Sequence, residues 1–230
     1  MNHLLKQSSF TATDEKGSVS ALLELPSDAK ALLVLAHGAG ANMHHVHMES
    51  ITRALARQKI ATFRFNFPFM EAGGRRTDSI AVCVESFASA LAALDKPANE
   101  LSLFIGGHSF GGRMSSHFVA QQTPTQSCRG LIYFSFPLHG KKPDVKRADH
   151  LASINLPMLF LSGTRDTLAE PDLLKQVVEK LPNTTLHWLE TADHGFKILK
   201  RTRESAENVY DEAARVVSAF IDKQLSSGQK

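Results

Sequence analysis

Short runs of apolar residues alternate along the chain with longer stretches in which apolar residues recur every three or four positions. The short runs are typical of strands buried on both faces, and the longer stretches are typical of helices with one buried face. The predicted strands cover residues 18–26, 31–38, 60–68, 100–107, 129–137, 156–163 and 184–190. The predicted helices cover residues 48–59, 78–95, 109–122, 169–181 and 202–224. This alternation predicts a single α/β domain over residues 1–230, doubly wound around a mostly parallel sheet.

The composition agrees with a globular protein of this size, since 43% of the residues are hydrophobic and 21% are charged. The net charge of +3 comes from lysines and arginines that are scattered, apart from the stretch HGKKPDVKRADH at residues 139–150. This stretch could contact an anionic group, but a solvated loop is the simpler interpretation. We therefore expect no nucleic-acid partner.

Targeting signals and membrane spans are not indicated by the pattern. The first residues lack a basic segment followed by a long apolar segment, and no apolar run approaches 18 residues. The two cysteines, Cys83 in an apolar helix and Cys128 in a polar connector, form no metal-binding or redox motif. We expect two free thiols, a cytoplasmic protein and no membrane partner.

The most informative motif is Gly107-His108-Ser109-Phe110-Gly111, which follows a predicted buried strand and precedes a predicted helix. This G-x-S-x-G pattern is typical of a sharp turn that exposes a nucleophilic serine above the end of a sheet. The glycines relieve crowding in that turn. Ser109 is therefore the expected nucleophile, and the alternative is a serine that only caps the helix.

A serine hydroxyl needs a general base and an acid that orients the base. Asp166 follows the strand at residues 156–163, and His194 follows the strand at residues 184–190. Both are expected on exposed loops at the same sheet edge as Ser109, in the order serine, acid, histidine. Asp193 and Asp144 remain alternatives for the acid.

The stretch His37-Gly38-Ala39-Gly40 also follows a predicted strand. Its glycines would let the backbone approach a substrate, so that the N–H groups of Ala39 and Phe110 form an oxyanion hole. Gly40 could donate in place of Ala39.

Three nearby histidines, His44, His45 and His47, raise the question of a metal site. No acidic or cysteine ligand lies at a matching spacing, and adjacent histidines point apart on a helix. We expect neither a metal nor a cofactor.

Several sequence blocks resemble those of the α/β-hydrolases, and within them the small cap-less proteins similar to dienelactone hydrolases. The blocks, which extend from Val34 to Phe196, are LAHGAGANMHH, FRFNFPFMEAGGRRTD, GGHSFGGRMSS, FSFPLHGKKP, LFLSGTRDT and ADHGF. The resemblance is greatest to a subgroup related to a subunit of a chromatin-acetylation complex. His108 and Phe110 stand where lysine and methionine are common in that subgroup, which affects the expected pocket shape.

The resemblance implies a serine hydrolase of the carboxylesterase type that acts on a small acyl substrate. Dienelactone hydrolases use a cysteine nucleophile, so Ser109 argues against their substrate. The alternatives are a thioesterase or peptidase, and a non-catalytic interaction module. Cap domains of this fold usually follow the sixth strand, and the segment Pro137–Asn155 is too short for a helical lid. Arg64, Asn66 and Arg113 resemble family residues near the site, with ion pairing as the alternative role.

Overall fold

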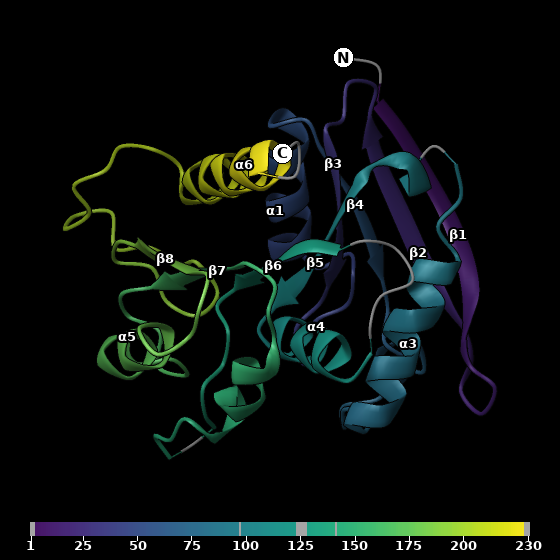
Figure 1. Cartoon of the computed structure of the whole chain (residues 1–230), viewed down its shortest axis with the longest axis horizontal. Helices are drawn as coiled ribbons and strands as arrows, with labels where there is room; N and C mark the ends of the chain where they lie inside the picture. The colour runs from purple at the N-terminus through teal and green to yellow at the C-terminus, as the bar shows by residue number, and fades with distance from the viewer. Residues whose placement is uncertain (1–2, 97, 123–127, 141, 228–230) are drawn as a thin grey trace.

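The computed structural model describes residues 3–96, 98–122, 128–140 and 142–227. In these described residues eight strands form one sheet in the order β1-β2-β4-β3-β5-β6-β7-β8, and the strands from β3 to β8 are parallel to one another (Figure 1). The mostly parallel α/β fold predicted from the sequence is therefore confirmed. The strands are β1 (His3–Thr13), β2 (Gly17–Pro26), β3 (Ala31–Ala36), β4 (Ile60–Phe65), β5 (Ser102–His108), β6 (Cys128–Phe134), β7 (Met158–Gly163) and β8 (Thr184–Leu189).

The first strand was not predicted from the sequence. β1 lies at one edge of the sheet and pairs antiparallel with β2, which is also antiparallel to β4. Its residues from His3 to Ser9 are all exposed, and most of them are polar. An edge strand with little buried surface lacks the apolar alternation by which strands are identified. Backbone pairing with β2 makes it a strand.

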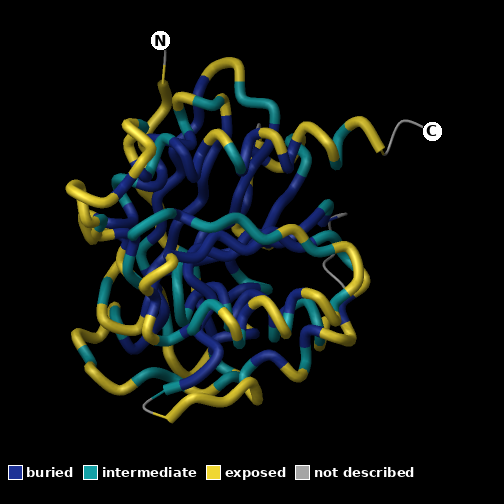
Figure 2. Tube along the Cα trace, turned by 90° about the vertical axis from the view of Figure 1, so that its left-hand side faces the viewer, coloured by how far each residue is buried: buried dark blue, intermediate teal, exposed yellow. Residues whose placement is uncertain are grey.

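Helices cover both faces of the sheet, with α1 and α6 on one face and α3, α4 and α5 on the other (Figure 1). The α-helices are α1 (Val46–Arg57), α2 (Pro68–Glu71), α3 (Ile80–Ala92), α4 (Phe110–Gln121), α5 (Pro171–Val178) and α6 (Val209–Ser227). The described part of the chain also contains the 3₁₀ segments η1 (Ala98–Glu100) and η2 (Lys146–Ser153). The central strands are buried on both faces, and exposed residues lie mainly on the helices and loops (Figure 2).

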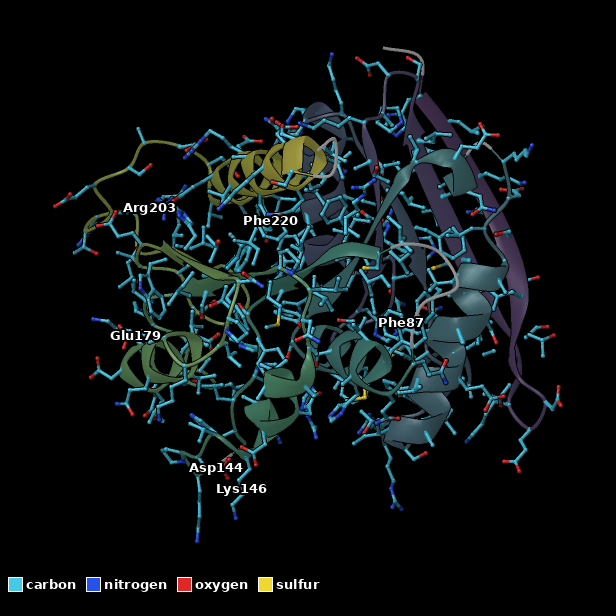
Figure 3. The ribbon with its side chains drawn as sticks, viewed as in Figure 1. Phe87, Asp144, Lys146, Glu179, Arg203 and Phe220 are labelled. Atoms are coloured by element: carbon cyan, nitrogen blue, oxygen red, sulfur yellow. The ribbon has the colours of Figure 1, made fainter. Side chains whose placement is uncertain are left out.

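The predicted start of the last helix at residue 202 is wrong. The loop before α6 contains Arg203, which is 9% exposed and forms an ion pair with Glu212 of α6. Figure 3 shows Arg203 beside the start of α6, and Phe220 on the same helix is directed toward the sheet. The ion pair of Arg203 thus holds this loop against α6, and Arg203 itself is not part of the helix.

Both cysteines are free and buried in the structure. Cys83 lies in α3, as expected, but Cys128 begins β6 and is only 8% exposed. The prediction that Cys128 lies in a polar connector is therefore wrong. Cys128 is in the strand because it pairs with Leu103 of β5.

The described part of the segment between β6 and β7 contains only the short η2 helix, so no cap covers the sheet edge there. The order of the strands reverses at β3, which has β4 on one side and β5 on the other. In open α/β sheets the carboxyl ends of strands at such a reversal form a ligand-binding crevice. None of the helices described by the structure combines the length and apolar composition that a bilayer crossing requires.

Candidate active site

Ser109 occupies a strained turn between β5 and α4. Its backbone angles are φ 51° and ψ −116°, which a residue with a side chain rarely adopts. The N–H of Ser109 donates a hydrogen bond of 2.9 Å to the carbonyl oxygen of Phe134 at the end of β6. Strain of this kind costs on the order of 1–3 kcal/mol and persists only where the surrounding structure maintains it.

The glycines on both sides of Ser109 allow the start of α4 to pack directly against β3 and β5. A Cβ atom built on Gly111 would lie 2.3 Å from the carbonyl oxygen of Ala36 in β3. A Cβ atom on Gly107 would lie 2.5 Å from the carbonyl carbon of Gly111. Both distances are well below van der Waals contact, so the turn requires glycine at both positions.

Ser109, His194 and Asp166 form a continuous hydrogen-bonded chain. Nε2 of His194 lies 2.7 Å from Oγ of Ser109, and Nδ1 of His194 lies 2.8 Å from Oδ2 of Asp166. A carboxylate only accepts hydrogen bonds, so Nδ1 carries the proton and Nε2 is free to accept one from the serine hydroxyl. The three side chains therefore have the geometry of a nucleophile, a base and an acid that orients the base.

Asp166 is buried, at 1% exposure, so the expectation that it lies on an exposed loop is wrong. Its Oδ1 accepts a hydrogen bond of 2.8 Å from the N–H of Leu168. This contact and the two distances to His194 hold the carboxylate in one orientation. A buried carboxylate needs such partners, because burial without them is costly.

The two alternative acids have other roles. Oδ1 of Asp193 accepts hydrogen bonds from the N–H groups of Gly195 and Lys197, at 3.0 and 2.9 Å, and so shapes the loop that carries His194. Asp144 is exposed at the periphery of the molecule beside Lys146, whose N–H it accepts (Figure 3).

Ala39 and Phe110, the expected oxyanion donors, lie in two different segments at this edge of the sheet. Ala39 and Gly40 lie in the exposed loop after β3, and Phe110 is the first residue of α4. Within the described ranges, neither the Ala39 N–H nor the Phe110 N–H donates to another residue. Both groups are thus available to a ligand.

His37 holds the loop of Ala39 in place, a role that the sequence analysis missed. Its Nδ1 donates to the carbonyl oxygen of Gly38 at 2.8 Å, and its Nε2 accepts from the N–H of Phe67 at 3.0 Å. Burial lowers the pKa of His37 to about 4, so the ring is neutral at pH 7. The sequence signal that could have identified this role is the position of His37 directly after β3.

Arg64 and Asn66 position the same loop from the other side. The Arg64 guanidinium donates to the carbonyl oxygen of Met43 at 2.8 Å, and Oδ1 of Asn66 accepts from the Met43 N–H at 2.9 Å. Arg64 also forms a buried ion pair with Glu24, at 3.5 Å. Arg64 and Asn66 thus have a structural role, which was the alternative to a role in the site.

The three clustered histidines do not converge. His44 is exposed, and Nδ1 of His45 accepts a hydrogen bond from the N–H of His47. His47 instead packs on His108, with ring centroids 4.3 Å apart, and its Nδ1 lies 3.0 Å from the hydroxyl of Tyr210. The described residues contain no group of three His, Cys, Asp or Glu side chains that could hold a metal ion.

His108, the second residue of the G-x-S-x-G motif, supports the loop of His194. Its Nε2 donates to the backbone carbonyl oxygen of His194 at 3.0 Å. Burial lowers the pKa of His108 to about 4 and that of His47 to about 2, so both rings are neutral at pH 7.

A pocket of about 400 Å³ lies directly above Ser109. Its walls come from the loop after β3, the start of α1 and the loop of His194. The lining residues are Gly38, Ala39, Gly40, Ala41, His45, His47, Met48, His108, Ser109, Leu168, His194 and Gly195. Sequence reasoning missed Leu168 and Met48, because no motif marks an apolar residue as part of a pocket wall.

Solved structures with a similar fold include a dienelactone hydrolase from Anabaena variabilis, at a TM-score of 0.74 and 15% identity over 97% of this chain and 99% of that one. Est1E from Butyrivibrio proteoclasticus, solved with ferulic acid bound, has a TM-score of 0.73 and 14% identity over 95% of this chain and 100% of that one. The esterase domain of a Rhodothermus marinus protein has a TM-score of 0.70 and 17% identity over 96% and 98% of the two chains. At these identities the likeness concerns the fold.

The family model for the alpha/beta hydrolase domain matches residues 29–222. The matched region begins before β3 and ends within α6, so it includes Ser109, Asp166 and His194. On this evidence the chain belongs to the α/β-hydrolase family.

Proposed function

We propose that this protein is a serine hydrolase of the carboxylesterase type, which cleaves an ester bond through an acyl-enzyme on Ser109. The observation that carries the proposal is the position of His194, whose two ring nitrogens lie 2.7 Å from Oγ of Ser109 and 2.8 Å from Oδ2 of Asp166. This arrangement is suited to transferring the serine proton to the histidine.

In the first half of the reaction, Oγ of Ser109 attacks the ester carbonyl carbon while Nε2 of His194 accepts the hydroxyl proton. Asp166 stabilises the imidazolium that forms and keeps the proton on Nδ1. The tetrahedral intermediate collapses when His194 gives its proton to the leaving oxygen, which departs as an alcohol and leaves Ser109 acylated.

In the second half, His194 removes a proton from a water molecule that attacks the acyl carbon. The acid is released, and the proton returns to Oγ of Ser109. The N–H groups of Ala39 and Phe110, with Gly40 as the alternative to Ala39, would stabilise the negative oxygen in both halves. The proposed cycle requires no cofactor.

An ester substrate is favoured because the structurally similar proteins include esterases. We also propose that residues 1–230 form a single domain and that the substrate is a small molecule. Within the family, we propose that the chain is most similar to the subgroup related to a subunit of a chromatin-acetylation complex. The alternatives are thioester or peptide hydrolysis, which shares the same acyl-transfer chemistry, and a non-catalytic interaction module. The alignment of His194 with Ser109 favours catalysis over the last of these.

The experiment is labelling with a fluorophosphonate, followed by mass spectrometry and a panel of p-nitrophenyl esters. We expect the label on Ser109, because an activated serine attacks the phosphorus and the oxyanion donors stabilise the charged oxygen. The Ser109→Ala variant should lose both labelling and turnover, whereas Ser8→Ala, which changes an exposed serine on β1, should retain both. Folded wild-type protein that remains unlabelled would favour the interaction module.

A further inference from the structure

A positively charged cluster lies one helical turn beyond Ser109. We define the basic cluster as Arg113 and His117 of α4 together with Arg147 and His150 of η2. The N–H of Arg113 donates to the carbonyl oxygen of Ser109 at 3.1 Å. The guanidinium of Arg113, which is half-buried, forms no hydrogen bond or ion pair with another described residue, and its buried Nε has no acceptor.

The second arginine increases the local positive charge. Nη1 of Arg147 donates to the carbonyl oxygen of His139 at 2.7 Å, but Arg147 has no acidic partner in the described part of the chain. Burial, followed by the charge of Arg147, lowers the pKa of Arg113. Two like charges are thus held near each other without a counterion from the described residues.

The acidic residues of this region do not supply the missing charge. Asp144 and Asp149 are both exposed, and neither forms an ion pair with a described residue. Oδ1 of Asp144 accepts the N–H of Lys146 in its own turn. Lys141 lies outside the described residues. Half-buried arginines are normally paired, because desolvating an unpaired charge is costly.

The two histidines form a preorganised wall of the basic cluster. Their rings are stacked, with centroids 3.7 Å apart and an interplanar angle of 14°. The hydroxyl of Ser116 donates to the carbonyl oxygen of Arg113 and so accepts from Nε2 of His150, each at 2.7 Å. Nε2 of His117 is buried and has no partner among the described residues. A buried polar atom without a partner, beside an unpaired guanidinium, leaves hydrogen-bonding capacity for a ligand or a water molecule.

The basic cluster is connected to the wall of the pocket. The N–H groups of Leu138 and His139 both donate to the carbonyl oxygen of Leu168, at 2.9 and 3.3 Å. Leu168 lines the pocket with Ser109, and His139 accepts the hydrogen bond from Arg147. The Arg147 side chain is thus linked through His139 to Leu168 of the pocket wall, and the four residues of the basic cluster lie next to the pocket lining without being part of it.

We propose that Arg113 and Arg147 bind a carboxylate or phosphate group carried by the substrate, so that the basic cluster is an anion subsite beside the pocket. This inference rests on the proposed serine hydrolase function and narrows the substrate to esters with an anionic group. A guanidinium matches the two oxygens of such a group with two parallel N–H donors.

The test compares pairs of esters that differ by one charge. One series is p-nitrophenyl hydrogen succinate, glutarate and adipate, each with its methyl-capped neutral partner. A second pair, 4-carboxyphenyl acetate and its methyl ester, places the charge on the leaving group. In wild-type protein we expect kcat/KM to favour at least one charged ester over its neutral partner by roughly 10- to 100-fold, as for hydrogen bonds to charged groups.

Arg113→Met keeps an unbranched side chain that can replace the apolar stem of the arginine and removes the charge, so this preference should fall to near one. Arg113→Lys should retain part of it. The control is Arg53→Met, which removes the same charge from an exposed position on α1 without a partner in the described residues and should keep the wild-type preference. A wild type without preference for any charged ester, or an unchanged preference in Arg113→Met, would overturn the proposal. If Arg113→Met does not fold, Arg147→Met replaces it.

Inhibition by free anions tests whether the anion site belongs to the substrate site or is a separate effector site. Free glutarate and inorganic phosphate should inhibit hydrolysis of a neutral ester competitively. Binding that depends on Arg113 but does not compete with the ester would indicate a separate effector site and overturn the substrate subsite. If wild-type protein hydrolyses no ester and resists the fluorophosphonate, the proposed function fails. Calorimetry with glutarate then tests the anion site alone: binding lost in Arg113→Met supports it, and no binding to wild type overturns it.

Discussion

Acidification should destabilise this fold through His37, the buried histidine that fixes the loop after β3. The ring is 0% exposed and is held between the carbonyl oxygen of Gly38 and the N–H of Phe67. Protonation of Nε2 would place one donor against another, since Nε2 now accepts from Phe67. The folded protein therefore resists protonation, and burial lowers the pKa of His37 from 6.5 to about 4.

The lowered pKa of His37 in the folded protein determines how its contribution to stability changes with pH. The unfolded chain binds a proton at His37 near pH 6.5, whereas the folded chain does so only near pH 4. Stability from this residue is present above pH 6.5 and is lost as the pH falls through about 4. At pH 5, about 1.5 pH units below the unfolded pKa, the loss from this one residue is about 2 kcal/mol, at about 1.4 kcal/mol per pH unit.

The assay is urea unfolding at pH 7 and pH 5, followed by the fluorescence of Trp188, the single tryptophan of the chain. The His37→Asn variant cannot titrate in this range and should also be less stable at both pH values, because it disturbs the hydrogen bond to Phe67. The free energy of unfolding should fall between pH 7 and pH 5 by about 2 kcal/mol less in the variant than in the wild type. An equal fall in both proteins, at equal m values, would show that His37 is not the residue responsible.

Gly111→Ala should lower the free energy of unfolding by more than about 2 kcal/mol in the same assay, because its Cβ would lie 2.3 Å from a carbonyl oxygen of β3. Gly40→Ala, whose Cβ would meet nothing within 4 Å, should change it far less. Asp166→Asn should reduce kcat for a p-nitrophenyl ester by roughly 10³-fold or more, and near-normal turnover would contradict its assignment as the acid. Burial raises the pKa of Cys83 to about 12 and that of Cys128 to about 11, so neither thiol should react quickly with a thiol reagent in the folded protein at pH 8. Unfolding without reductant should expose two reactive thiols, and fewer than two would contradict the free state of both.

The features that follow from the sequence alone are those that depend on neighbouring residues. Buried parallel strands are continuous apolar runs, so β3, β5 and β7 could be located within a few residues of their observed bounds. The turn at Ser109 was equally clear, because its glycines lie within two residues of the serine. The steric crowding in this turn involves residues close in the sequence, so it is visible there as glycines on both sides of Ser109.

Other features were decided only by the tertiary structure. β1 is a strand because of its partner β2, and Cys128 is buried because it pairs with Leu103 of β5 at the start of β6. The contact between Ser109 and His194 joins residues 85 positions apart, and the stack of His117 on His150 joins α4 to a 3₁₀ segment. Residues far apart in the chain meet only when the sheet and its helices pack together, and no local pattern of polar and apolar residues encodes which side chains then lie within hydrogen-bonding distance.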